Sequence, residues 1–221
     1  MSWLKRALGM EAPKPSTATA ELPGAPALPL GLAPGRMICL NPNLKGLLVG
    51  ESDVVVPDDD KVWAVGSIDL GQAKRLERFY LDSGDHFIQF VMSGPGADDI
   101  DDVILFGYHE VTTVASKQEL LRLVGPQARI GLPTYELEGA EYARQWGSEQ
   151  GQTELVPLME RVVNPEGAYR VSHNSMLYAR DMGLTNRREF LLFSVEEDQE
   201  GNVSLTTAVG VSLQLTDITV L

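Results

Sequence analysis

The sequence has very little cysteine, since Cys39 is the only one among 221 residues. An intramolecular disulfide is therefore excluded, and the composition favours a reducing compartment. No stretch approaches the ~20 apolar residues that a transmembrane helix needs. Residues 1–10 do not resemble a signal peptide, because Lys5 and Arg6 interrupt their apolar residues. We therefore expect a cytoplasmic protein that is at most peripheral to the inner membrane.

Basic residues and histidines are also scarce. Lysine and arginine number 18 against 31 acidic residues, which gives a formal net charge of −13. This charge argues against nucleic-acid binding, because phosphates would be repelled. Three histidines and one cysteine make a structural zinc site unexpected. The chain also has no G-x-S-x-G, G-x-x-x-x-G-K-[ST] or G-x-G-x-x-G motif, so the common hydrolase and nucleotide-binding signatures are missing.

Proline is concentrated near the start of the chain. Residues 11–35 contain six of the 13 prolines, which predicts a semi-extended linker in a disordered N-terminal tail. Residues 1–35 carry three basic and two acidic side chains. Their net charge of +1, within a total of −13, leaves −14 on the body from residue 36 onward.

The first ten residues form a short amphipathic peptide ahead of this linker. At 100° per residue Trp3, Leu4 and Leu8 fall on one side of a helix, while Lys5 and Arg6 face away. Such a peptide suits a membrane interface or the groove of a protein partner. It is too short to be a stable helix alone, so binding would have to order it. The alternative is a terminus without function.

The body from residue 36 to 221 reads mainly as strands separated by polar turns. The predicted strands are residues 61–70, 75–81, 86–92, 103–108, 190–195 and 203–213. In the last of these, apolar residues alternate with small or polar ones, which is typical of a half-buried strand. We expect an α+β fold that is predominantly antiparallel β, either a sandwich or two β-rich halves, with one or two short helices.

One helix is well signalled and a second is weaker. Ser116 and Glu119 form a capping box, apolar residues follow, and Gly125 ends the helix. Residues 136–146 are the second candidate.

The body is either one domain or two related halves, residues 36–125 and 126–221. Residues 76–79 resemble 159–162 at an offset of 83, and residues 103–106 resemble 190–193 at an offset of 87. A duplication would produce this echo, and so would chance among apolar strands.

Two clusters could carry chemistry. Asp98, Asp99, Asp101 and Asp102 could hold Ca²⁺ or Mg²⁺, although the run lacks the layout of an EF-hand. The structural alternative, which we favour, is an acidic hairpin loop that keeps a strand edge soluble.

Asp85 and His86 form the second cluster, with the residue types of a general acid and base. The structural alternative is an ordinary turn. If residues 86–92 pair with residues 102–109, this turn and the acidic loop lie at opposite ends of one hairpin, roughly 20 Å apart. His173, in turn, is expected to make a hydrogen bond at the end of a strand.

Several segments, taken in order, resemble the bacterial YjfK-like family, a domain of unknown function. They are Ser67 to Gly71, Ser83 to Asp85 with Phe87, Asp98 to Asp102 running into Leu105 and Phe106, Val171 to Asn174 with Met176, Tyr178 and Arg180, and Ala208 to Val211. The aromatic and basic start is similar to the family's N-terminus, while the Pro-rich linker is longer than expected. The family has no established activity, so the resemblance carries over no catalytic residues; no cofactor is predicted from the sequence. It implies an association with phage-shock-type coiled-coil proteins, small membrane proteins and glutathionylspermidine synthase-like ligases, in an envelope-associated system.

We therefore expect a non-enzymatic accessory or adaptor protein. Its β-rich body would bind a protein partner, and its N-terminal peptide would contact the membrane or another component. The alternative is a metal-dependent enzyme or a Ca²⁺- or Mg²⁺-binding module that uses the loop from Asp98 to Asp102. A third possibility is a protein that binds a small ligand between two β-rich halves.

Overall fold

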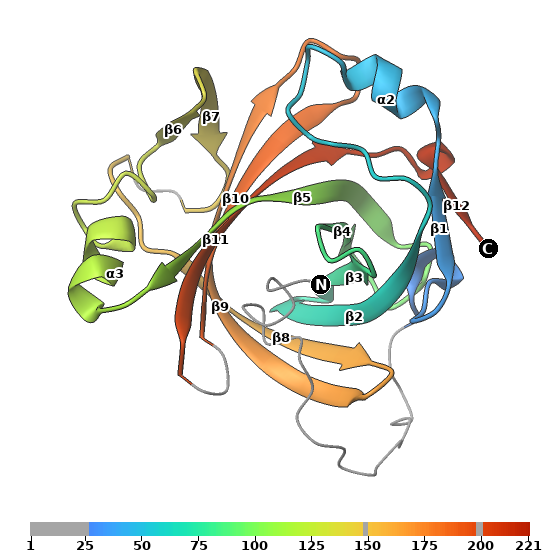
Figure 1. Ribbon diagram of the computed structural model, residues 1–221, viewed down its shortest axis with the longest axis horizontal. Coiled ribbons are helices and arrows are strands. Elements are labelled where there is room, and N and C mark those ends of the chain that lie inside the picture. The colour runs from blue at the N-terminus through green and yellow to red at the C-terminus, as the bar shows by residue number, and fades with distance from the viewer. Residues whose placement is uncertain (1–26, 148–149, 198–200) are drawn as a thin grey trace.

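The computed structural model describes residues 27–147, 150–197 and 201–221. Antiparallel strands make up most of this part of the chain, and two α-helices accompany them. Eight of the strands close into a barrel, in the order β2-β3-β4-β5-β11-β10-β9-β8, because β8 pairs back with β2 (Figure 1). The barrel strands are β2 Asp60–Gly71, β3 Lys74–Leu81, β4 His86–Met92, β5 Ile100–Val114, β8 Val156–Asn164, β9 Gly167–Asp181, β10 Arg188–Glu197 and β11 Val203–Ser212.

The prediction of a mainly antiparallel β fold is confirmed, but the sandwich is wrong. Closure depends on a short ladder in which Val65 to Ile68 of β2 pair with Val163 to Glu160 of β8. These strands are far apart in the sequence and share no turn, so no local pattern indicates that they meet. All six predicted strands nevertheless lie in the barrel.

Strand β11 is buried on both faces rather than half-buried. Its small residues point into the barrel, where an eight-stranded ring leaves room only for closely packed side chains. Gly210 shows the constraint, because a Cβ atom there would lie 2.5 Å from the ring of Phe106. The alternation was correctly recognised, but the small side chains face the interior instead of solvent.

Two outer layers cover much of the barrel. Beyond β2 the sheet continues through β1 (Met37–Leu40) to β12 (Ile218–Val220), with α2 (Asn43–Leu48) beside them (Figure 1). Two 3₁₀ turns, Pro29–Gly31 and Leu215–Asp217, flank this layer. On another side lie α3 (Lys117–Val124) and the hairpin of β6 (Thr134–Leu137) and β7 (Ala140–Arg144). The larger hydrophobic core lies between these layers and the outer face of the barrel.

The first predicted helix is confirmed as α3. The Ser116 hydroxyl accepts a hydrogen bond from the Glu119 amide at 3.2 Å, and the Glu119 carboxylate accepts one from the Ala115 amide at 3.0 Å. The second predicted helix is wrong, because residues 136–146 belong to the β6–β7 hairpin. Its two turn residues, Glu138 and Gly139, both have positive φ (50° and 84°), as a tight hairpin turn requires. Within the described residues, no helix has the length and apolar character to cross a membrane.

Four consecutive strands from each part of the chain build the barrel. β2 to β5 form one meander and β8 to β11 the other, and the two first strands pair with each other, as do the two last. The sequence echo, however, relates residues of β3 to β8 and residues of β5 to β10, which do not hold matching places in the two meanders. Duplication therefore stays a prediction.

Candidate functional site

A cluster of charged and hydroxyl side chains lies inside the barrel. We call it the interior polar cluster and define it as Arg78 and Tyr80 of β3, Glu160 of β8, His173 of β9 and Glu196 of β10. All five are buried. They meet because β3, β8, β9 and β10 direct alternate side chains toward the barrel axis, so residues from distant strands face one another.

Glu160 is the centre of the interior polar cluster. Its carboxylate accepts hydrogen bonds from the Tyr80 hydroxyl at 2.8 Å and from Arg78 Nη1 at 3.1 Å. His173 Nε2 lies 2.7 Å from the same carboxylate, and His173 Nδ1 lies 3.2 Å from Glu196 Oε1. One imidazole thus connects two buried carboxylates, and one of them also pairs with a guanidinium.

Opposite charges outweigh burial for two members of the cluster. Burial alone would raise the pKa of Glu160, but Arg78 and His173 lower it to about 2. Burial alone would lower the pKa of His173, but Glu196 and Glu160 raise it to about 9. For Tyr80, burial and the neighbouring Glu160 both raise the pKa. At neutral pH the cluster therefore contains a Glu160 carboxylate and an imidazolium.

The backbone is shaped around this carboxylate. A Cβ atom on Gly66 would lie 1.6 Å from Glu160 Oε1, so only glycine fits at that point of β2. Among the described residues, Arg78 Nη2, Tyr169 Oη and Glu196 Oε2 are buried without a hydrogen-bond partner. Because its members are buried, the cluster holds a proton within the barrel rather than presenting it to a dissolved substrate.

The interior polar cluster was not among the predicted sites. His173 was expected at the end of a strand, but it lies in the middle of β9 and bridges two carboxylates. A usable signal was present: Glu160 stands between the inward-facing Leu158 and Val162. A charged residue at an apolar position of a strand indicates a buried, paired charge.

Asp85 and His86 lie at the start of β4, and they do not join the interior polar cluster. His86 Nε2 lies 2.8 Å from the carbonyl oxygen of Val55, and burial lowers the pKa of His86. The Asp85 side chain is exposed. The two strands pair as a hairpin, but over residues 100–107 rather than 102–109: His86 pairs with Gly107 at one end of the β4–β5 ladder, and Met92 pairs with Ile100 at the other. Catalysis by Asp85 and His86 stays a prediction.

The acidic loop closes the other end of this hairpin. Asp99 Oδ2 accepts a hydrogen bond from the Gly96 amide at 2.7 Å, and Asp102 Oδ1 accepts one from the Val103 amide at 2.9 Å. Asp98 and Asp101 are exposed. In the described ranges no three His, Cys, Asp or Glu side chains are grouped so that they could hold a metal ion. Two of the four aspartates thus bind neighbouring backbone amides, Asp99 in the loop and Asp102 in β5. Metal binding by this run stays a prediction.

Arg75 of β3 ties three chain segments together on the outer face of the barrel. It donates hydrogen bonds to the Gly94 carbonyl, to the Ala27 carbonyl at 3.1 Å and to Glu77 Oε1 at 2.9 Å. Glu77 also accepts a hydrogen bond from the Ser67 hydroxyl at 2.5 Å, while burial raises its pKa. Arg75 therefore fixes Ala27, the first described residue, beside β3.

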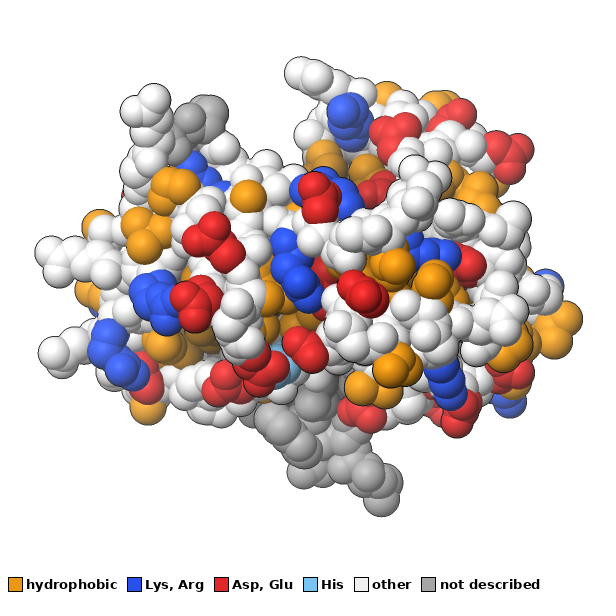
Figure 2. All heavy atoms as spheres, turned by 90° about the horizontal axis from the view of Figure 1, so that it is seen from above, with side chains coloured by type: hydrophobic (Ala, Val, Ile, Leu, Met, Phe, Trp, Pro, Cys, Tyr) orange, Lys and Arg blue, Asp and Glu red, His pale blue; other side chains and the backbone are white. Residues whose placement is uncertain are grey.

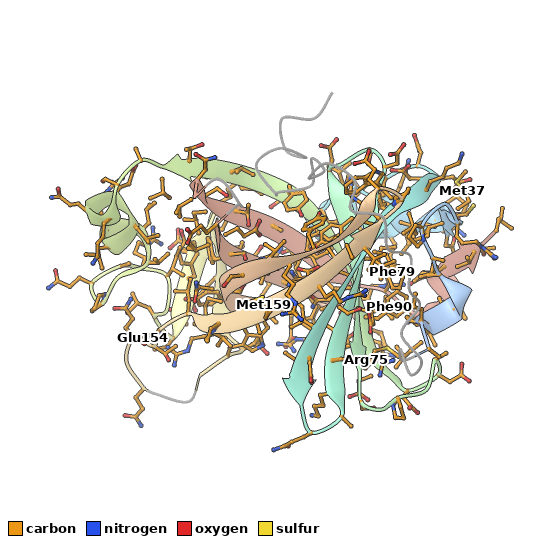
Figure 3. All side chains as sticks on the ribbon, turned by 90° about the horizontal axis from the view of Figure 1, so that it is seen from below. Met37, Arg75, Phe79, Phe90, Glu154 and Met159 are labelled. Carbon is orange, nitrogen blue, oxygen red and sulfur yellow. The ribbon has the colours of Figure 1, made fainter. Side chains whose placement is uncertain are left out.

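No other described residue range covers the outer surface of β8 and the adjoining half of β9. We call it the outer β8–β9 face and define it as Met159, Arg161, Ala168, Arg170 and Ser172, all exposed. Arg161 and Arg170 lie directly opposite each other in the antiparallel ladder, and Met159 lies opposite Ser172. Figure 3 shows Met159 on β8 and Arg75 on β3, in a view from below. Figure 2 shows a different side of the molecule, seen from above, where acidic, basic and apolar side chains are mixed.

A groove runs beside α3. Its volume is about 590 Å³, and its apolar lining includes Leu120, Leu121 and Val124 of the helix together with Leu155 and Val195. None of the residues of α3 is buried. The helix therefore presents apolar surface that the described part of the chain leaves open.

The predicted membrane or partner contacts, Trp3, Leu4, Lys5, Arg6 and Leu8, lie outside the described residues. That prediction depends on the sequence alone.

Comparison with known proteins identifies relatives without a described activity. A family model described as "Protein of unknown function (DUF2491)" matches residues 3–219. The chain is 31% identical over 198 residues to "Uncharacterized protein YjfK" of Escherichia coli (strain K12), covering 86% of this chain and 89% of that protein. No solved structure matches the chain.

Proposed function

We propose a function for this chain, which belongs to the bacterial family of proteins of unknown function (DUF2491). We infer that the protein is a non-enzymatic cytoplasmic accessory protein that attaches to an anionic membrane surface through its N-terminal peptide. Attached there, its β-barrel body binds a protein partner.

This proposal is supported by the hydrogen bond from Arg75 to the Ala27 carbonyl, which we call the tether. The Arg75 guanidinium that donates this hydrogen bond is buried, so the first described residue is held at a defined point beside β3. The 16 residues from 11 to 26 reach roughly 50 Å when extended as Pro-rich segments are. The peptide can thus reach a surface while its attachment to the barrel stays fixed.

The composition of residues 1–10 suits a weak, reversible membrane contact. Trp3, Leu4 and Leu8 supply the apolar side, and Lys5 and Arg6 each contribute about 1 kcal/mol at an anionic leaflet. A peptide this small binds weakly alone, so a second contact by the body or by a partner would be needed for firm attachment. The burial of the interior polar cluster supports a role in binding rather than in catalysis.

Flotation with liposomes tests the proposal. The full-length protein, a version lacking residues 1–12 and a matched control lacking residues 13–24 are mixed with vesicles containing phosphatidylglycerol, at low and high salt. We expect the full-length protein and the linker deletion to float at low salt, and the version lacking residues 1–12 to float much less. Equal flotation of all three proteins would overturn the role of the peptide.

A K5Q/R6Q variant separates charge from insertion. We expect its flotation at low salt to fall well below that of the full-length protein at low salt, because the attraction of Lys5 and Arg6 to the lipid is removed. A protein that does not float in any condition would contradict membrane attachment.

A further inference from the structure

We propose that the outer β8–β9 face is a second membrane contact, in which Arg161 and Arg170 bind the phosphate groups of anionic lipids and Met159 enters the interface. This inference rests on the proposed function and extends it from the N-terminal peptide to the barrel itself.

Arg161 and Arg170 hold directly opposed positions on two neighbouring strands. Directly opposite residues of an antiparallel ladder have Cβ atoms about 5 Å apart, and like charges at this spacing are destabilising. Arg161 and Arg170 hold such positions. Among the described arginines only these two and Arg36 lack a side-chain hydrogen bond or ion pair with another described residue. In a body with a charge of −14, two adjacent arginines without a carboxylate partner indicate a site for an external anion.

The other residues of the outer β8–β9 face, Met159, Ala168 and Ser172, are apolar or small. The exposed Glu197 of β10 borders the face, because it pairs with Ser172. Met159 is 55% exposed beside Arg161. Arginine bound to phosphate next to an exposed apolar side chain suits the headgroup region of a membrane better than a purely acidic protein surface.

The tether, the hydrogen bond from Arg75 to Ala27, has a fixed position relative to the arginine pair. Glu77, Ser67, Arg161 and Arg170 form one row across β3, β2, β8 and β9. At about 4.8 Å between strands, this row is roughly 14 Å long. Arg75, which fixes Ala27, pairs with Glu77 at the β3 end of the row (Figure 3). Ala27, the first described residue, is therefore held at the β3 end of the row that contains the arginine pair, so one lipid surface can engage both the peptide and the pair.

The test compares R161Q/R170Q with K117Q/R122Q in the full-length chain. Both variants lower the net charge by the same amount, and the control changes exposed residues of α3. Binding to phosphatidylglycerol vesicles is titrated at low salt. Because each basic residue near an anionic surface strengthens binding about fivefold, we expect R161Q/R170Q to bind roughly 25-fold more weakly, and K117Q/R122Q to bind nearly as the wild type.

The outcomes separate this inference from the proposed function. Equal binding by R161Q/R170Q and K117Q/R122Q, with binding lost on deletion of residues 1–12, would overturn the second contact and leave the peptide contact intact. Loss in R161Q/R170Q without any effect of the deletion would support the second contact and overturn the peptide. Binding of soluble polyglutamate that needs both arginines, without binding to vesicles, would overturn the lipid assignment in favour of an acidic protein. Inorganic phosphate at millimolar concentration should compete with the vesicles. Loss of vesicle binding by the wild-type chain, but not of the residual binding by R161Q/R170Q, would support the phosphate contact.

Discussion

The two faces of β8 and β9 both carry charge, at consecutive residues of the same strand. Glu160 points into the barrel and contacts Arg78, Tyr80 and His173. Its neighbour Arg161 points outward and meets Arg170, a residue of the same sign. The inner charge is balanced by partners within the fold, and the outer charge has none among the described residues.

This difference follows from solvation. A charge removed from water destabilises the protein by several kcal/mol unless opposite charges and hydrogen bonds replace its hydration, so the interior must supply them. An exposed arginine keeps its hydration, and a like-charged neighbour costs only a fraction of that amount. The inner face can therefore be read as structural, while the uncompensated outer face has binding capacity left for another molecule.

Breaking the inner pair should give the largest effect. Arg78→Met leaves the buried Glu160 carboxylate without its guanidinium, and we expect the free energy of unfolding to fall by about 3–5 kcal/mol. The matched change on the outer face, Arg161→Met, should alter it by less than about 0.5 kcal/mol. Urea denaturation followed by tryptophan fluorescence measures both. Similar losses in the two variants would remove the distinction between the faces.

The pH dependence of stability should give the next largest effect. The pKa of His173 is about 9 in the folded protein, above its ordinary value of about 6.5. Its stabilising contribution is therefore complete below pH 6.5 and is lost as the pH rises through 9. The pKa of Glu160 is about 2, so its contribution is present above pH 4.5 and is lost as the pH falls through 2.

Together these two residues stabilise the fold most between about pH 4.5 and 6.5. From pH 6.5 to 9.5 we expect the free energy of unfolding to decrease by on the order of 3 kcal/mol. A His173→Gln variant should show a much flatter alkaline limb in urea titrations at each pH. An unchanged slope in this variant would show that other groups cause the decrease.

The sequence predicted the parts of the fold that depend on local patterns, and it did not predict those that depend on distant strands. Strand positions followed from alternation, and α3 followed from the capping pair Ser116 and Glu119, because both are local patterns. The β6–β7 hairpin was taken for a helix, although Glu138 and Gly139 mark its turn. Closure of the barrel through β2 and β8 could not be predicted, because it depends on a ladder between residues almost 100 positions apart.

The interior polar cluster was missed for the same reason. Glu160 alone stands out in the sequence, as a charge at an apolar strand position, but its partners Arg78 and His173 are brought to it only by the closed barrel. The cross-strand pairing of Arg161 with Arg170 likewise needs the register of β8 against β9. Such sites depend on non-local register, which a single sequence does not specify.

Relieving the outer repulsion should give the smallest effect, and it should have the opposite sign. Arg161→Gln removes a like charge from a directly opposed pair, so we expect a gain of about 0.5 kcal/mol in the free energy of unfolding. Arg170→Gln should give a similar gain, and the double variant should gain little more, because the same repulsion cannot be removed twice. Lys117→Gln on α3 is the control and should change nothing measurable. Gains that add fully would mean that the two guanidinium groups do not interact. A shared gain, combined with weaker vesicle binding, would mean that the face gives up stability in order to hold an anion.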